Sequence, residues 1–173
     1  QEDAHEFLRM LVEQLSKSSD PKLQTMGKTP PGQKPKVPPT VVPTTVVHQM
    51  FGGLLRSQVK CHSCKNPSNT YDPFLDLSLE VTKANSMEKA FKEFTHSELL
   101  CGQNEYRCGN CKRMSNASKQ FLVQTPPHLL TVQFKRFSFL QRRGGKIGKH
   151  IQFPAVFNMA PFTTTPSEKC TYK

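Results

Sequence analysis

Two pairs of cysteines, Cys61 with Cys64 and Cys108 with Cys111, constrain the fold of this chain more than any other feature. Each pair has two residues between its cysteines, which places two thiolates at the tip of one tight turn, called a knuckle below. Two knuckles together supply four thiolates, the closed tetrahedral ligand set that a structural zinc ion prefers. The chain must therefore bring together two segments separated by 43 residues. Antiparallel strands around a short helix would do this.

Disulfides and a redox dithiol are the two other interpretations of these pairs. A redox site needs only one CxxC motif, and two isolated CxxC pairs are a poor disulfide framework. We therefore expect the four cysteines to bind a structural Zn²⁺ ion. The other two cysteines, Cys101 and Cys170, have no partner at ligand spacing and are interpreted as ordinary thiols. Unpaired thiols favour an intracellular location, in the cytoplasm, the nucleus or both.

The N-terminal segment carries the clearest helical pattern. Residues 2–17 are predicted to form a helix, because apolar side chains recur every three or four positions. These side chains are Ala4, Phe7, Leu8, Leu11, Val12 and Leu15. Residues 18–45 differ from this segment, since seven of the fourteen prolines lie between Pro21 and Pro43. Such a composition predicts an exposed linker or insertion.

The rest of the chain alternates between strand and helix patterns. Apolar and polar residues alternate over residues 75–81, which predicts a half-buried strand. A short helix is predicted over residues 85–95, with Asn85 and Glu88 as a capping pair. Further strands are expected at residues 121–124 and 129–137, and a weaker strand, interrupted by Pro154, is expected at residues 151–157. The predicted fold class is α+β with mostly antiparallel strands.

Charge is unevenly distributed along the chain, which has a net charge of +11. Twelve of the thirteen acidic residues lie in residues 2–105, whereas residues 106–167 hold ten lysines and arginines and no acid. This balance permits acidic or nucleic-acid partners, so a nucleic-acid-binding zinc ribbon is an alternative, although no aromatic-basic RNA-binding signature is present. The apolar runs are too short to span a membrane, and no membrane partner is expected.

Six segments, taken in order, resemble the ubiquitin-specific proteases, a family of papain-like cysteine proteases that remove ubiquitin. They are QEDAHEFL (1–8), FGGLLRSQVKC (51–61), YDPFLDLSLEV (71–81), GQNEYRCGNC (102–111), PHLLTVQFKRF (127–137) and KIGKHIQFP (146–154). Each segment alone is a weak match, but their common order covers nearly the whole chain outside residues 18–45. The resemblance implies a hand-shaped domain with a thumb, fingers and a palm. It assigns residues 1–17 to the thumb helix, 46–122 to fingers with zinc at their tip, and 123–173 to part of the palm.

The resemblance also implies ubiquitin as the partner and assigns residues that bind its C-terminal tail, Leu-Arg-Leu-Arg-Gly-Gly. Asp3 and Glu6 are three positions apart, so both carboxylates can lie on one side of the helix start and pair with the tail arginines. Gln1 would bind the tail backbone, and Phe137 would line the channel. The alternative interpretation is that Asp3 caps the helix, Glu6 is a surface charge and Phe137 belongs to the core.

The resemblance implies a cysteine nucleophile, a histidine base and an Asp or Asn that orients the histidine. None of these falls in the matched segments, and we expect them before Gln1 and after Lys173. The resemblance thus predicts a deubiquitinating protease of which these 173 residues alone are inactive. A non-catalytic relative that binds ubiquitin without cleaving it would share every residue of this chain.

Overall fold

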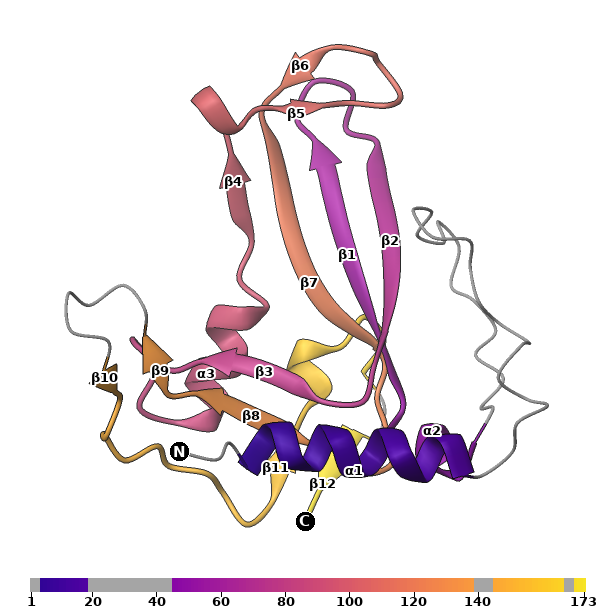
Figure 1. Cartoon of the computed structure of the whole chain (residues 1–173). Coiled ribbons are helices and arrows are strands. Elements are labelled where there is room, and N and C mark those ends of the chain that lie inside the picture. The colour runs from indigo at the N-terminus through magenta and orange to yellow at the C-terminus, as the bar shows by residue number, and fades with distance from the viewer. Residues whose placement is uncertain (1–3, 19–44, 139–144, 167–169) are drawn as a thin grey trace.

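A computed structural model of the chain describes residues 4–18, 45–138, 145–166 and 170–173. A long antiparallel sheet rises from a base in which helices pack on short strands (Figure 1). The predicted Pro-rich linker lies almost entirely outside the described residues. Within the described part of the chain, no helix has both the length and the apolar composition needed to cross a membrane.

The long sheet has the strand order β2-β1-β7-β4, and all its pairings are antiparallel. Its strands are β1 (Gly53–Cys61), β2 (Pro67–Phe74), β4 (Glu98–Leu100) and β7 (Ala117–Thr125). In the register Cys61 faces Ala117 of β7, so β1 ends at the first knuckle. The small hairpin of β5 (Tyr106–Arg107) and β6 (Met114–Ser115) carries the second knuckle to the same end of the sheet (Figure 1).

The hydrophobic core lies in the base, where the short strands meet a helix. Strand β3 (Leu77–Glu80) pairs in parallel with β8 (Val132–Lys135), an exception to the antiparallel pattern. Helix α3 (Met87–Phe94) buries Phe91 completely. Its ring lies 5.0 Å from that of Phe157 and 5.2 Å from that of Phe162, measured between centroids. This aromatic cluster anchors α3 to the C-terminal part of the chain.

Several short elements complete the base. They are the 3₁₀ turn Ala160–Phe162 and the strands β9 (Phe137–Ser138), β10 (Gly145–Lys146), β11 (Phe157–Asn158) and β12 (Thr171–Tyr172). A second 3₁₀ turn, Gly102–Asn104, lies between β4 and β5 near the tip of the long sheet (Figure 1). β9 pairs with β10, and β11 pairs with β12, both antiparallel. Together with the long sheet they confirm the predicted α+β class with mostly antiparallel strands.

One local prediction around α3 is wrong, and a second is confirmed only in part. The N-cap is Ser86 and not Asn85, because the Ser86 hydroxyl accepts from the Lys89 N–H at 3.2 Å. The Asn85 carbonyl instead accepts from the backbone N–H of Gln152 at 3.0 Å. Of the predicted strand at residues 151–157, Gln152 forms an isolated parallel bridge with Ser86, and Phe157 begins the short strand β11. Pro154 cannot donate a ladder hydrogen bond, which explains why the strand does not continue.

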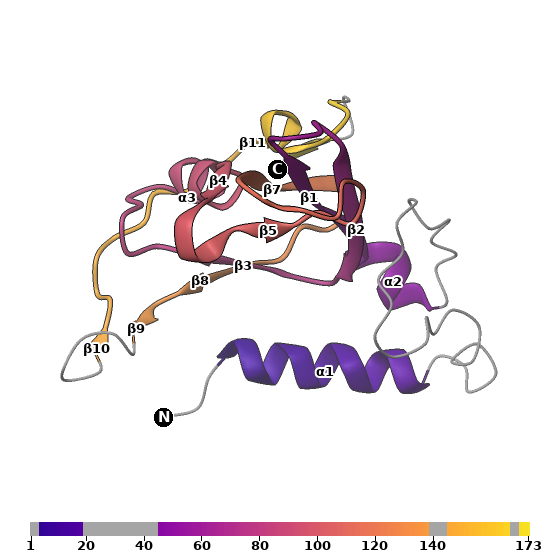
Figure 2. The ribbon, with the colours of Figure 1, turned by 90° about the horizontal axis from the view of Figure 1, so that it is seen from above.

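The N-terminal helix forms as predicted but is not covered as its pattern suggests. Helix α1 (Ala4–Ser18) lies along the base and contacts α2 (Val46–Phe51) (Figure 2). Of its apolar stripe, Phe7 is 68% exposed, Leu11 45% and Leu15 50%. Among the described residues, no element buries these three side chains in the way that the core buries the apolar face of α3.

Candidate functional site

The four paired cysteines meet at the tip of the long sheet. All four Sγ atoms lie within 4.8 Å of one another. The Sγ atoms of Cys61 and Cys111 are 4.0 Å apart, and those of Cys64 and Cys108 are 3.6 Å apart. A zinc ion with Zn–S bonds of about 2.3 Å requires tetrahedron edges of roughly 3.8 Å. The donor set and its spacing therefore suit a tetrahedral thiolate-bound metal ion.

The two knuckles are built in the same way, which accounts for their matching geometry. In each, the N–H of the first cysteine donates to the carbonyl five residues later, Asn66 at 3.2 Å or Arg113 at 3.0 Å. The residue after the second cysteine has a positive φ in both cases, 59° at Lys65 and 60° at Lys112. This left-handed residue turns the chain back sharply after the second thiol. Each knuckle thereby presents both of its thiols to the shared cluster.

The electrostatics of the cluster also favour a cation. The backbone N–H of Cys64 is the main cause that lowers the pKa of Cys61 to about 6. At Cys111 the N–H of Arg113 lowers the pKa, but burial and the three neighbouring thiols outweigh it and raise the value to about 11. Four thiolates so close together repel one another. A divalent cation at the centre removes that repulsion and stabilises the fully deprotonated set.

The remaining cysteines lie outside the cluster. Cys101 is exposed beside the 3₁₀ turn at Gly102–Asn104, and Cys170 is fully buried in the base. Neither is part of a disulfide, and neither is part of the four-cysteine group. This placement agrees with their interpretation as ordinary thiols.

The predicted tail-binding residues are distributed over two elements. Glu6 is exposed in the first turn of α1. Phe137 is 52% exposed on β9, so it is not a core residue in the described chain. In both views the first turn is the end of α1 nearer to β9 (Figure 1, Figure 2). Gln1 and Asp3 lie outside the described residues.

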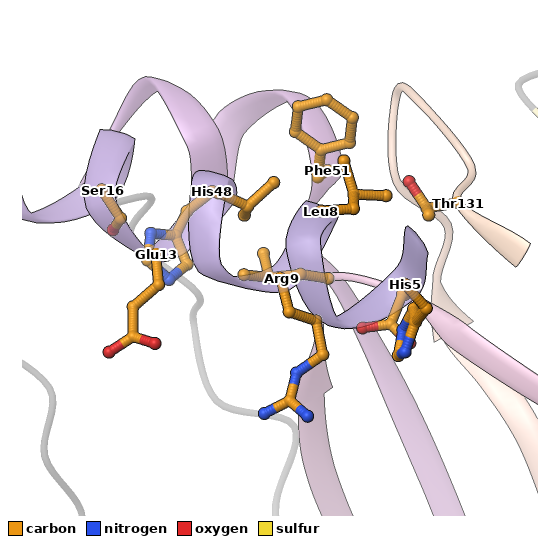
Figure 3. Close-up of a pocket in the computed structure, with 11 residues that line it drawn as sticks. His5, Leu8, Arg9, Glu13, Ser16, His48, Phe51 and Thr131 are labelled. Atoms are coloured by element: carbon orange, nitrogen blue, oxygen red, sulfur yellow. The ribbon is translucent and has the colours of Figure 1, made fainter. Parts of the chain in front are cut away.

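A pocket of about 280 Å³, which the sequence did not reveal, separates α1 from the base. Its lining comes from α1, α2, the turn after β2 and Thr131. Figure 3 shows His5 and Thr131 toward one end of this pocket and Ser16 and His48 toward the other. Asp76 also lines it, and its Oδ2 atom lies 3.0 Å from His5 Nε2. No local pattern pairs these two residues, because 71 positions separate them.

Comparison with known sequences gives a consistent result over the whole chain. The sequence model of the ubiquitin carboxyl-terminal hydrolase family matches residues 1–173. The chain is 42% identical over 173 residues to the probable ubiquitin carboxyl-terminal hydrolase 16 of Schizosaccharomyces pombe, of which it covers 35%. It is 40% identical over 167 residues to the human ubiquitin carboxyl-terminal hydrolase 42, of which it covers 12%. The chain thus spans about a third or less of these two curated relatives.

Solved structures lead to the same family. The fold matches the SAGA DUB module Ubp8/Sgf11/Sus1/Sgf73 bound to ubiquitin aldehyde, with a TM-score of 0.72 and 29% identity over 97% of this chain. A Ubp8-containing SAGA module bound to monoubiquitin matches with a TM-score of 0.74 and 32% identity over 95% of this chain. In each case the match covers 34% of the other chain. With a full-length sequence match, the same fold and a zinc-compatible cysteine cluster, this chain belongs to the ubiquitin carboxyl-terminal hydrolase family.

Proposed function

We propose that the protein is a deubiquitinating cysteine protease that hydrolyses the isopeptide or thioester bond after the C-terminal glycine of ubiquitin. The main support is the fold, which over nearly the whole chain matches structures that contain bound ubiquitin. In this proposal residues 46–122 supply the fingers, whose long sheet holds the body of ubiquitin, while β3 and α3 of the same range pack in the base. Residues 1–17 belong to the thumb and residues 123–173 to the palm, and the ubiquitin tail passes between them.

The tail site consists of carboxylates at the start of α1 and an aromatic side chain on β9. Glu6, together with Asp3, pairs with the two arginines of the tail through charge-assisted hydrogen bonds. The exposure of Glu6 in the first turn leaves its carboxylate accessible to such a partner. Gln1 binds the tail backbone, and the exposed ring of Phe137 lines the channel.

The proposed cofactor is one structural Zn²⁺ ion held by Cys61, Cys64, Cys108 and Cys111. When bound, it ties the two knuckles together and leaves no coordination position for a reacting water molecule. Replacement of Cys108 by Ser should abolish stoichiometric zinc binding and unfold the tip of the fingers, whereas Cys101→Ser should change neither. Native mass spectrometry and circular dichroism measure both effects. A metal-free chain with folded fingers would contradict the proposed zinc site.

In the proposed mechanism, a thiolate attacks the carbonyl after the last glycine, and a histidine protonates the leaving amine. The thiols of the finger cluster face one another, so they are not proposed as nucleophiles. We place the nucleophile and its base outside these 173 residues, so the chain alone binds ubiquitin without hydrolysing it.

Two assays test this proposal. Calorimetry with ubiquitin should show binding to the chain, and a ubiquitin–fluorophore substrate should be cleaved by the intact protein but not by the chain. Cleavage by the chain alone would refute the placement of the catalytic residues. Binding without cleavage by the intact protein would identify a non-catalytic ubiquitin-binding relative. Salt-sensitive binding of duplex nucleic acid, in the absence of ubiquitin binding, would favour the zinc-ribbon alternative.

A further inference from the structure

Polar side-chain contacts connect helix α1 to the rest of the molecule near both of its ends. Its middle faces the 280 Å³ pocket, and Phe7 and Leu15 of its apolar stripe are at least half exposed. Near its C-terminal end, Ser16 Oγ lies 3.4 Å from Thr45 Oγ1, just before α2. Near its N-terminal end, His5 Nε2 lies 3.0 Å from Asp76 Oδ2. The contact between His5 and Asp76 thus connects the first turn of α1 to the base.

Asp76 is well suited to hold His5, because the residues that follow it are anchored in the base. It precedes Leu77, which is buried and whose N–H donates to the Thr131 carbonyl at 2.9 Å. Ser78 Oγ lies 3.5 Å from the same Oδ2 atom of Asp76. The side chains of His5 and Asp76 are only 18% and 25% exposed, so water screens their interaction less than it screens a surface pair.

The contact determines where the next residue of α1 points. Successive residues of an α-helix are rotated by about 100° around its axis. With His5 turned toward Asp76 and the base, the neighbouring Glu6 is directed away from this contact and is exposed. A rotation or displacement of the first turn would move the Glu6 carboxylate relative to β9. Pairing with a specific arginine of a bound tail requires that this position be maintained.

We propose that Asp76, acting through His5, is a positioning residue that sets the first turn of α1 for binding of the ubiquitin tail. This inference rests on the proposed function, in which Glu6 binds a tail arginine. The imidazole N–H donates to the Asp76 carboxylate, and the pair connects the thumb helix to the turn that joins the fingers to the base.

The test compares variants that remove or retain this hydrogen bond. His5→Leu and Asp76→Ala remove it, whereas His5→Gln retains a side-chain N–H that can donate to Asp76. Ser16→Ala is the matched control at the other end of α1. Dissociation constants are measured by calorimetry for ubiquitin and for ubiquitin with alanine in place of both tail arginines.

We expect His5→Leu and Asp76→Ala each to weaken the binding of ubiquitin about tenfold, and the double variant to be no weaker than either single one. His5→Gln should restore most of the affinity, and Ser16→Ala should leave it unchanged. For the alanine-tailed ubiquitin all variants should bind equally, because the arginine contact that depends on the first turn is then missing. Circular dichroism and zinc content verify that each variant is folded.

Equal weakening for both ubiquitins would mean that the pair acts only on stability, and it would overturn the inference. The inference is also overturned if Glu6→Gln loses affinity that depends on the tail arginines while His5→Leu keeps it. The tail site would then work without the contact between His5 and Asp76. If Glu6→Gln itself has unchanged affinity, the tail site of the proposed function is wrong and the inference is overturned with it. The Glu6→Gln measurement thus distinguishes the two failures.

Discussion

Helices α1 and α3 have similar sequence patterns but very different surroundings. Both carry apolar residues at helical spacing, and both carry a Glu–Lys pair four residues apart. In α3 the apolar face is covered, and Ala90 and Phe91 are 1% and 0% exposed. In α1 the corresponding face is open, and Phe7 is 68% exposed. The periodicity of a sequence therefore predicts a helix, but it does not predict what covers its apolar face.

The difference has a structural origin in the elements on either side of each helix. α3 follows β3 directly and is enclosed by aromatic rings from the C-terminal part of the chain. α1 is separated from the base by a pocket and is joined to it mainly through α2 and polar contacts near its ends. Three pairs of substitutions follow in order of decreasing expected effect. The first and the third compare the two helices, and the second measures how firmly the start of α3 is capped.

The largest difference is expected between Phe91→Ala and Phe7→Ala. Phe91 is fully buried against two other rings, so its truncation should lower the free energy of unfolding by about 3–5 kcal/mol. Phe7 is mostly exposed, so the same truncation should change it by less than about 0.5 kcal/mol. Urea denaturation of the chain measures both values. A loss above 2 kcal/mol (about the value of a buried side chain) for Phe7→Ala would show that the face of α1 is covered in solution.

A smaller effect is expected at the start of α3. Ser86 caps the helix through its hydroxyl, so Ser86→Ala should lower the free energy of unfolding by about 1 kcal/mol. Asn85→Ala is the matched control, because the contact of Asn85 with Gln152 uses its backbone carbonyl, which the substitution retains. Urea denaturation should separate the two variants. Equal destabilisation would show that the sequence-based assignment of Asn85 as part of the cap was partly correct.

The smallest effect is expected from the two exposed ion pairs, where the helices should behave alike. Glu13 Oε1 lies 2.7 Å from Lys17 Nζ, and Glu88 Oε1 lies 2.8 Å from Lys92 Nζ. Glu13→Gln and Glu88→Gln should shift the urea midpoint equally and barely above experimental error, because water screens both pairs.

The hydrogen bond from Lys17 lowers the pKa of Glu13 from 4.5. Any contribution of Glu13 is thus present above pH 4.5 and is lost as the pH falls through its lowered folded pKa. A larger shift of the urea midpoint for one helix would show that its ion pair stabilises the fold more than the exposure of the two pairs suggests.

The sequence predicted the meeting of the two knuckles more accurately than the strand pairings of the base. The two CxxC pairs predicted that two segments separated by 43 residues meet, and the four Sγ atoms lie within 4.8 Å of one another. The parallel pairing of β3 with β8 was not foreseen, because alternation identifies a strand without identifying its partner. The weak strand predicted at residues 151–157 is interrupted at Pro154, as its sequence indicates, and only Gln152 and Phe157 of this segment take part in strand pairing.

By itself, the sequence determined features that depend on neighbouring residues: the two knuckles, helices α1 and α3, and the strand patterns that correspond to β3, β8 and part of β7. These follow from spacing and periodicity, which act over one or two turns of chain. Only the tertiary structure decided which apolar faces are covered and which distant side chains meet. The contact of His5 with Asp76 joins residues 71 positions apart, and the open face of α1 depends on what packs beside it. A local sequence pattern identifies the apolar face of a helix but not the element that packs against it. Packing between distant segments decides this, so no short stretch of sequence predicts it.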